Sequence, residues 1–195
     1  MHRIANILST LRIILSPVFL YLFFQEDFLW KAIGLGVFIV AAVTDYFDGY
    51  FARKYKTTSD FGAFLDPLAD KFLTFSGFFV MPFIAPSQFP WWAIGLIIFR
   101  DIFITLFRVY TKRKEQPMVT RMTAKIKTTV QMVFLYIGLA VGLFKGVPFF
   151  LGDWIDLLLD TEILFYMMLF VTFVTVYTGI EYLVINRAVF KKIES

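Results

Sequence analysis

Four aspartates are the residues of this chain best suited to chemistry, and all lie within residues 45–70. Asp45 and Asp48 are three residues apart, and Asp66 and Asp70 are four apart. Residues at these spacings share one face of a helix, so each pair forms a short acidic stripe. Four clustered carboxylates need a positive partner, and oxygen ligands of this kind select Mg²⁺, Mn²⁺ or Ca²⁺. The pattern predicts a divalent-metal site in which two ions share the carboxylates, an arrangement suited to phosphoryl chemistry.

Composition removes the main alternatives to carboxylate and metal chemistry. The chain has no Cys, and its single His is His2. Thiolate nucleophiles, disulfides and Cys-ligated zinc or iron–sulfur sites are therefore excluded, and no internal His can serve a catalytic triad. Catalysis must use carboxylates, cationic side chains or a bound metal.

The elements that position the aspartates are expected to be membrane helices. Hydrophobic residues make up 59% of the 195 residues, and 26 residues are Phe, whereas soluble domains average about 45–50% apolar residues. A membrane-spanning helix needs about 20 largely apolar residues. Six such segments can be placed, and we predict an all-α integral membrane protein with six transmembrane helices in a single domain over residues 1–195. The segments are 7–25, 29–50, 63–84, 91–111, 124–145 and 163–186.

The distribution of Lys and Arg predicts the orientation of these spans. Of the 19 cationic residues, Lys31 and Lys145 fall at one side, Arg100 falls within a span, and all the others fall at the opposite side. Lys and Arg collect in cytoplasmic loops, so both termini and the aspartates are expected at the cytoplasmic face. A short loop joins the second and third spans, which should bring the acidic stripes together. Residues 153–162 are expected to form an acidic, solvated outer loop.

Three small residues lie on the same helix faces as the aspartates: Gly49, Ala52 and Gly62. Small residues in membrane helices usually permit close helix packing, but they can also open a slot for a ligand. Both roles are compatible with the sequence.

The four aspartates have two other interpretations. Charges at helix ends that face water would explain a single aspartate. They would not explain four aspartates that lie in register on two helix faces. An ion-coupling site in a transporter also clusters acids within the membrane. The short chain, the absence of an inverted repeat and the position of the acids at the membrane boundary argue against a transporter.

The aspartate segment resembles a known enzyme signature. The spacing Asp45-x2-Asp48-Gly49-x2-Ala52-Arg53-x8-Gly62-x3-Asp66-x3-Asp70 is similar, position for position, to that of the CDP-alcohol phosphotransferases. The resemblance implies a six-span, homodimeric enzyme in the cell inner membrane, where an alcohol displaces CMP from a CDP-linked substrate. It implies Mg²⁺ or Mn²⁺ as cofactor, with two ions, and no nucleic-acid partner.

Further segments extend the resemblance toward phosphatidylglycerophosphate synthases. One segment, Asn6-Ile7-Leu8-Ser9-x2-Arg12 followed by Pro17, is similar to the family's bacterial N-terminal segment. Two others are similar to phosphatidylglycerophosphate synthases in particular, namely Arg100-Asp101-x6-Arg108 and Lys125-Ile126-Lys127-Thr128-x2-Gln131. The implied reaction joins CDP-diacylglycerol and sn-glycerol 3-phosphate to give phosphatidylglycerophosphate and CMP. A cardiolipin synthase of the same family, with phosphatidylglycerol as acceptor, is the alternative, although its acceptor carries less charge.

By resemblance, each predicted site residue receives a role. Asp70 is the expected general base in addition to its part in the metal site. The residues expected to bind the CDP moiety are Gly49, Ala52, Arg53, Gly62 and Ser9. The acceptor carries a dianionic phosphate and needs cations. The candidates are Arg108, Lys125 and Lys127, while Arg100 is expected either to touch this phosphate or to support the site by pairing with other groups.

Overall fold

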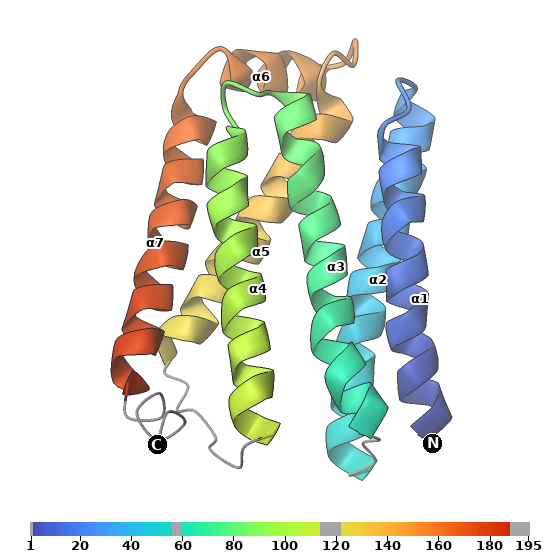
Figure 1. Ribbon diagram of the computed structural model, residues 1–195. Coiled ribbons are helices and arrows are strands. Elements are labelled where there is room, and N and C mark those ends of the chain that lie inside the picture. Colours follow the sequence, from blue (N-terminus) through green and yellow to red (C-terminus); the bar gives the residue numbers. More distant parts are fainter. Residues whose placement is uncertain (1, 56–59, 114–121, 188–195) are drawn as a thin grey trace. The chain divides into compact units, whose positions relative to one another are not determined.

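The computed structural model describes residues 2–55, 60–113 and 122–187; side chains of 2–9, 45–70, 112, 113 and 124 lie outside the described set. Within these ranges the regular structure is entirely α-helical, as predicted. Six long helices overlap the six predicted segments, and one short helix, α6, was not predicted. The helices are α1 His2–Phe23, α2 Phe28–Tyr55, α3 Asp60–Ile84, α4 Trp91–Arg113, α5 Met122–Phe144, α6 Phe150–Leu159 and α7 Ile163–Ile185 (Figure 1).

Two described helical segments are long and apolar enough to cross a membrane, namely Lys125–Phe144 and Ile163–Ile185. Shorter apolar stretches lie in the three N-terminal helices, at Thr10–Phe23, Phe28–Thr44 and Lys71–Ile84. α4 carries the charged residues Arg100, Asp101 and Arg108 along its length, which lowers its mean hydropathy. The two apolar helices agree with a membrane protein, while the six-span topology stays a prediction.

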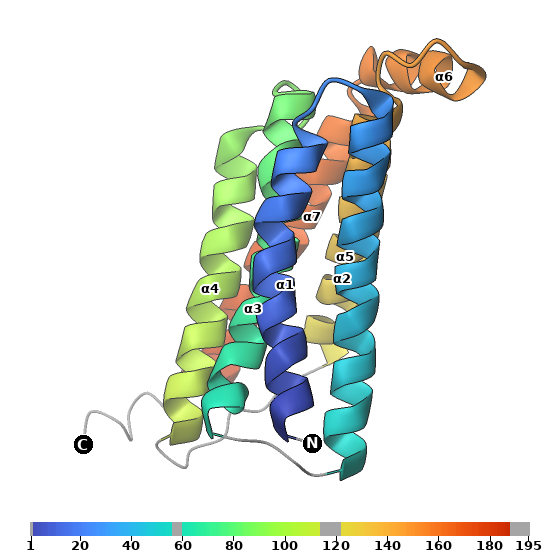
Figure 2. The same cartoon turned by 90° about the vertical axis from the view of Figure 1, so that its right-hand side faces the viewer.

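The chain divides into two compact units, and the first comprises Met1–Ile84 with Gly138–Asp156. In this unit α1 packs along both α2 and α3, and α2 also contacts α3 (Figure 2). Phe19, with no exposed surface, lies between the helices with its ring centroid 4.9 Å from that of Phe38. A Cβ atom at Gly34 would lie 3.1 Å from the Cβ of Leu22, so this glycine permits the close approach of α2 to α1.

The end of α5 belongs to the first unit and packs against α3 through glycines. A Cβ atom at Gly138 would lie 2.3 Å from Met81 Cε, and one at Gly142 would lie 2.4 Å from Ile84 Cδ1. Both atoms are the ends of flexible side chains, so a larger residue at either position would force Met81 or Ile84 to move. The two glycines thus leave room for these side chains between α3 and α5.

The second unit comprises Ala85–Ile137 with Leu157–Ser195, and its α4 packs against α7. The side chain of Gln88 joins distant parts of this unit. Its Nε2 atom donates to the carbonyls of Leu159, at 3.1 Å, and Thr161, at 2.7 Å, and its Oε1 atom accepts the backbone N–H of Phe165 at 2.9 Å. Gln88 thus fixes the start of α7 beside the turn that precedes α4.

Helix α6 corrects the expectation that residues 153–162 form an irregular loop. The chain leaves α5 at Gly146, whose φ of +69° favours glycine, and resumes a helix at Phe150. A Cβ atom at Gly152 would lie 1.9 Å from the carbonyl oxygen of Val147, so the tight turn requires glycine. Phe150 and Trp154 are exposed on α6, whose charged residues are Asp153 and Asp156. At ten residues, α6 is too short to give a spanning signal in the sequence.

Candidate active site

The predicted metal ligands occupy the end of α2 and the beginning of α3. Asp45 and Asp48 lie within Phe28–Tyr55, and Asp66 and Asp70 lie within Asp60–Ile84, so their expected helical setting is confirmed. The side chains of these four residues lie outside the described set, and the convergence of their carboxylates stays a prediction. The donor set itself, four carboxylates without His or Cys, fits Mg²⁺ or Mn²⁺. Among the described residues, no other cluster of three or more His, Asp or Glu residues could hold a metal ion.

The predicted CDP-binding residues are distributed over three contacting helices. Ser9 lies on α1, Gly49, Ala52 and Arg53 lie on α2, and Gly62 lies on α3. α1 contacts both of the other helices, so one helix triplet of the first unit carries all five residues and the four aspartates. Their side-chain contacts fall outside the described residues.

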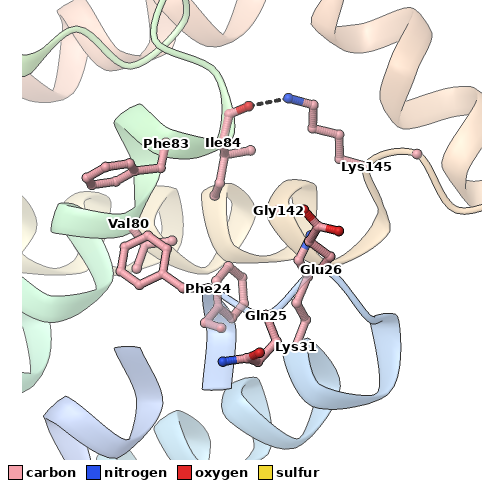
Figure 3. A pocket seen from close by; sticks show the side chains of 11 residues that line it. Phe24, Gln25, Glu26, Lys31, Val80, Phe83, Ile84, Gly142 and Lys145 are labelled. Atoms are coloured by element: carbon pink, nitrogen blue, oxygen red, sulfur yellow. Dashed lines mark hydrogen bonds between the residues drawn. The ribbon is translucent and has the colours of Figure 1, made fainter. Parts of the chain in front are cut away.

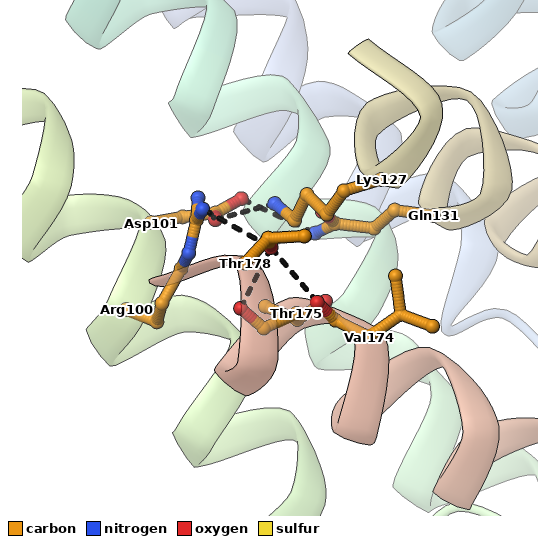
Figure 4. Close-up of polar contacts among 7 residues, drawn as sticks. All are labelled: Arg100, Asp101, Lys127, Gln131, Val174, Thr175 and Thr178. Atoms are coloured by element: carbon orange, nitrogen blue, oxygen red, sulfur yellow. Dashed lines mark hydrogen bonds and ion pairs between the residues drawn. The ribbon is translucent and has the colours of Figure 1, made fainter. Parts of the chain in front are cut away.

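A buried polar cluster occupies the second unit, where α4, α5 and α7 each contribute side chains (Figure 4). Asp101 is at its centre, with a side chain that is 1% exposed. Its Oδ1 atom accepts from Lys127 Nζ at 2.5 Å and from Arg100 Nη1 at 3.1 Å, and its Oδ2 atom accepts from Gln131 Nε2 at 3.3 Å. Two cations therefore share one carboxylate in surroundings that exclude water.

These contacts give Lys127 a partner that was not predicted, while its role as a ligand of the acceptor phosphate stays a prediction. Its side chain is 3% exposed and is ion-paired with Asp101, whereas a phosphate-binding lysine must present its ammonium to the ligand. Lys127 and Gln131 are four residues apart and share one face of α5, so both reach the same carboxylate. Lys127 is placed to hold Asp101, and through it Arg100, in position.

Arg100 combines a fixed position with unused donor capacity, and its expected pairing with other groups is confirmed. Its Nη1 atom donates to Asp101 and its Nη2 atom donates to Thr178 Oγ1 at 3.3 Å. Its Nε atom is buried and has no hydrogen-bond partner among the described residues. A Cβ atom at Gly179 would lie 3.0 Å from Arg100 Cγ, so this glycine of α7 provides the space in which the guanidinium lies.

Arg108 and Lys125 are exposed, unlike Lys127. Arg108 lies beside Tyr182 of α7: its Nε atom donates to the hydroxyl at 3.4 Å, and its Cζ atom is 5.5 Å from the ring centroid. Stacking on an aromatic ring limits the motion of the guanidinium while leaving its outer face available. Arg108 and Lys125 can therefore meet an anionic ligand, whereas Lys127 is committed to Asp101.

Sequence reasoning did not identify Thr178 or Tyr182, the partners of the two arginines. A signal was present, because polar residues recur at helical spacing within the apolar α7 at Thr172, Thr175, Thr178 and Tyr182. All four are buried, and polar side chains on the buried face of a membrane helix usually serve function or helix contacts.

Comparison with known proteins identifies the family. The model of the CDP-alcohol phosphatidyltransferase family matches residues 2–177. A CDP-diacylglycerol–glycerol-3-phosphate 3-phosphatidyltransferase of Cereibacter sphaeroides is 37% identical over 152 residues, which cover 74% of this chain and 67% of the relative. A probable phosphatidylglycerophosphate synthase of Mycobacterium tuberculosis is 35% identical over 145 residues, which cover 73% of this chain and 65% of the relative. A CDP-diacylglycerol–glycerol-3-phosphate 3-phosphatidyltransferase of Salmonella paratyphi A is 35% identical over 139 residues, which cover 68% and 74%. The alignments thus span about two thirds to three quarters of these relatives, and the chain belongs to the CDP-alcohol phosphatidyltransferase family.

Proposed function

We propose that this chain transfers the phosphatidyl group of CDP-diacylglycerol to sn-glycerol 3-phosphate, releasing CMP and forming phosphatidylglycerophosphate. The observation that carries the proposal is the family match over residues 2–177, joined to relatives whose names state this reaction. The complete aspartate signature on α2 and α3 supports it, because without those carboxylates the family chemistry could not operate. Membership of the family does not favour the transporter alternative.

The aspartates are proposed to hold the metal ions of the reaction. Asp45, Asp48, Asp66 and Asp70 would bind two Mg²⁺ or Mn²⁺ ions, which when bound neutralise the pyrophosphate charge of the CDP-linked lipid. Arg53, with Ser9, Gly49, Ala52 and Gly62, is proposed to bind the CDP moiety.

The chain's own residues are proposed to activate the acceptor. Asp70 takes the proton of the attacking glycerol hydroxyl as general base. The hydroxyl oxygen forms a bond to the phosphorus that carries diacylglycerol. The bond from that phosphorus to the bridging pyrophosphate oxygen breaks, and CMP leaves with its electron pair. The proton remains on Asp70 until it passes to solvent.

Recognition of the acceptor is assigned to the second unit. Its phosphate is a dianion, which favours charge-assisted contacts with fixed cations. Arg108, held on Tyr182, and the exposed Lys125 are the proposed direct ligands. Arg100 is proposed to contribute its unpartnered Nε atom or its charge, while Lys127 acts through Asp101.

The wider organisation is proposed on the same basis. We place the chain in the cell inner membrane with six spans and both termini in the cytoplasm, because the cations are strongly asymmetric along the sequence. One catalytic domain over residues 1–195 and a homodimeric assembly complete the proposal.

An acceptor screen tests this function. The purified protein is given CDP-diacylglycerol and labelled sn-glycerol 3-phosphate, and metal-dependent CMP release with labelled lipid product is expected. Product with phosphatidylglycerol but not with glycerol 3-phosphate would assign a cardiolipin synthase instead. Solute transport in liposomes without consumption of CDP-diacylglycerol would refute the enzymatic proposal.

A further inference from the structure

A second polar site lies at the end of the first unit away from the aspartates. A cavity of about 320 Å³ opens where α1 ends, α2 begins, and α3 and α5 end (Figure 3). Its polar lining includes Lys31, Lys145 and Glu26, and its apolar lining includes Phe24 and Phe83. α2 has 28 residues, about 42 Å of helix at 1.5 Å per residue, so its beginning and its acidic end lie a membrane thickness apart.

The two lysines of this cavity are the two that depart from the charge asymmetry of the sequence. In the predicted topology the other Lys and Arg residues, apart from Arg100 within a span, fall at the opposite side of the membrane. Lys31 and Lys145 come from different helices, yet both line one cavity. Cations are disfavoured on the translocated side of a membrane protein, and two scattered surface lysines would have no reason to converge.

The two lysines of the cavity make no direct ion pair among the described residues. Lys145 Nζ donates to the carbonyl of Ile84, the last residue of α3, which is an uncharged partner. Neither lysine forms an ion pair with any residue in the described part of the chain, nor does Glu26. The lining itself holds two lysines and one glutamate, and Asp156 lies next to it, where its Oδ1 atom accepts the backbone N–H of the lining residue Gly146 at 3.4 Å. With no ion-pair partner among the described residues, the two lysines are the groups in the lining that an anion would contact.

The apolar surface beside the cavity indicates which anion fits. Phe24 and Phe83 are 45% and 56% exposed and meet edge to face at a centroid distance of 5.0 Å. Phe79 extends this surface along α3, 5.5 Å from Phe83. Inorganic phosphate would lose hydration against these rings without gaining apolar contact. A phosphodiester attached to acyl chains would satisfy the lysines and the aromatic surface together.

We propose that this cavity binds the headgroup of an anionic phospholipid, with the phosphodiester between Lys31 and Lys145 and an acyl chain on Phe24 and Phe83. In the proposed orientation of the chain, this lipid belongs to the outer leaflet. The site itself does not depend on that orientation. The site is separate from the transfer reaction, because neither lysine belongs to the proposed catalytic or substrate-binding residues.

Photolabelling resolved by peptide tests the proposal on the full chain in phosphatidylcholine nanodiscs. The probe is phosphatidylglycerol with a photoreactive headgroup, and a phosphatidylcholine probe with the same reactive group is the comparison. Phosphatidylglycerol should label peptides around residues 24–31 and 142–147 preferentially. Lys31→Gln should lower this labelling about fivefold, the effect of one lysine near an anionic headgroup. Labelling of peptides from the end of α2, which carries Arg53 and Lys54, should not change, which provides an internal control.

Two carboxylate variants test whether removing a negative charge from the cavity increases labelling by the anionic lipid. Glu26→Gln removes the negative charge from the cavity and should raise labelling about fivefold. Asp153→Asn makes the same charge change outside the cavity lining and should leave labelling unaltered. CMP release by Lys31→Gln should equal that of the wild type, which separates this site from the proposed function.

Three results would overturn the proposal. The first is equal labelling of these peptides by the phosphatidylcholine probe. The second is unchanged labelling in Lys31→Gln. The third is loss of labelling on addition of millimolar inorganic phosphate, which would assign the cavity to free phosphate instead of a lipid.

Discussion

Replacement of Asp101 by Asn tests whether the buried cluster of the second unit is organised around one carboxylate. The substitution keeps the shape of the side chain and removes its charge. Lys127, 3% exposed, then loses an ion-pair partner that is 2.5 Å away. The amide keeps one oxygen as an acceptor, on the side of Lys127 and Arg100 or on the side of Gln131. Its NH2 group meets the donors on the other side, so at least one of the hydrogen bonds is lost.

The magnitude follows from the burial of both partners. Removing one member of a buried ion pair costs about 3–5 kcal/mol, because the other charge is left uncompensated in a medium of low polarity. The same loss at an exposed pair would be about 0–1 kcal/mol. Asp101 and Lys127 are 1% and 3% exposed, so the larger range applies to the free energy of unfolding of Asp101→Asn.

The assay is a double-mutant cycle on the purified protein in detergent. Unfolding is measured for Asp101→Asn, for Lys127→Met and for the double variant, with Asp153→Asn as an exposed control. The double variant should be less destabilised than the sum of the single variants, because removing both charges leaves no unpaired ion. The KM for glycerol 3-phosphate should rise in Asp101→Asn, since Arg100 loses its charged partner and keeps only its contact with Thr178.

A loss of less than about 1 kcal/mol in Asp101→Asn would place the pair in the range of solvent-exposed contacts. The interpretation of Lys127 as a positioning residue would then be wrong. An additive cycle would have the same consequence, because it would show that the two side chains do not stabilise each other.

The remaining predictions concern the acceptor cations, the turn before α6 and the metal site. Lys125→Met should raise the KM for glycerol 3-phosphate with little change in stability, because Lys125 is exposed. Lys127→Met should mainly lower stability, because Lys127 is buried and paired with Asp101. Equal effects of the two substitutions in steady-state kinetics and in thermal unfolding would contradict this difference. Gly152→Ala should lower the free energy of unfolding by about 1–3 kcal/mol, because its Cβ would lie 1.9 Å from a backbone oxygen. Gly95→Ala is the control: the site has open space around it, so the same assay should show a neutral or slightly stabilising effect. Asp70→Asn should abolish CMP release and leave the unfolding midpoint near that of the wild type; a near-normal rate would exclude Asp70 as the base. Chelation of divalent ions should stop CMP release by the wild type, and added Mg²⁺ should restore it.

The long helices could be predicted because each combines an apolar run with polar boundaries. The predicted segment 91–111 became Trp91–Arg113, and the segment 163–186 became Ile163–Ile185. The short α6 could not be predicted in the same way. Its ten residues are too few to span a membrane, and its start depends on the local conformation of Gly146 and the contacts of Gly152.

The polar partners within the second unit depended on tertiary structure that the sequence pattern does not specify. The sequence showed that Arg100 and Asp101 are charged residues within a predicted span, which need ion-pair or hydrogen-bond partners there. Their contacts with Lys127 and Thr178 arise because α4, α5 and α7 bring side chains from three distant segments together. Hydrophobic periodicity describes which face of a helix is buried but not which helix covers that face.

The two lysines of α5 show how helix geometry divides a motif into separate tasks. Lys125 and Lys127 are two residues apart, and at about 100° per residue their side chains leave the helix about 200° apart. The two side chains therefore start on opposite faces of α5, and the structure has Lys125 exposed and Lys127 buried. Gln131 lies one turn beyond Lys127 and joins it on Asp101. The spacing Lys-x-Lys-x3-Gln therefore separates one exposed cation, able to meet an anion directly, from a pair that holds Asp101 and, through its shared carboxylate, Arg100.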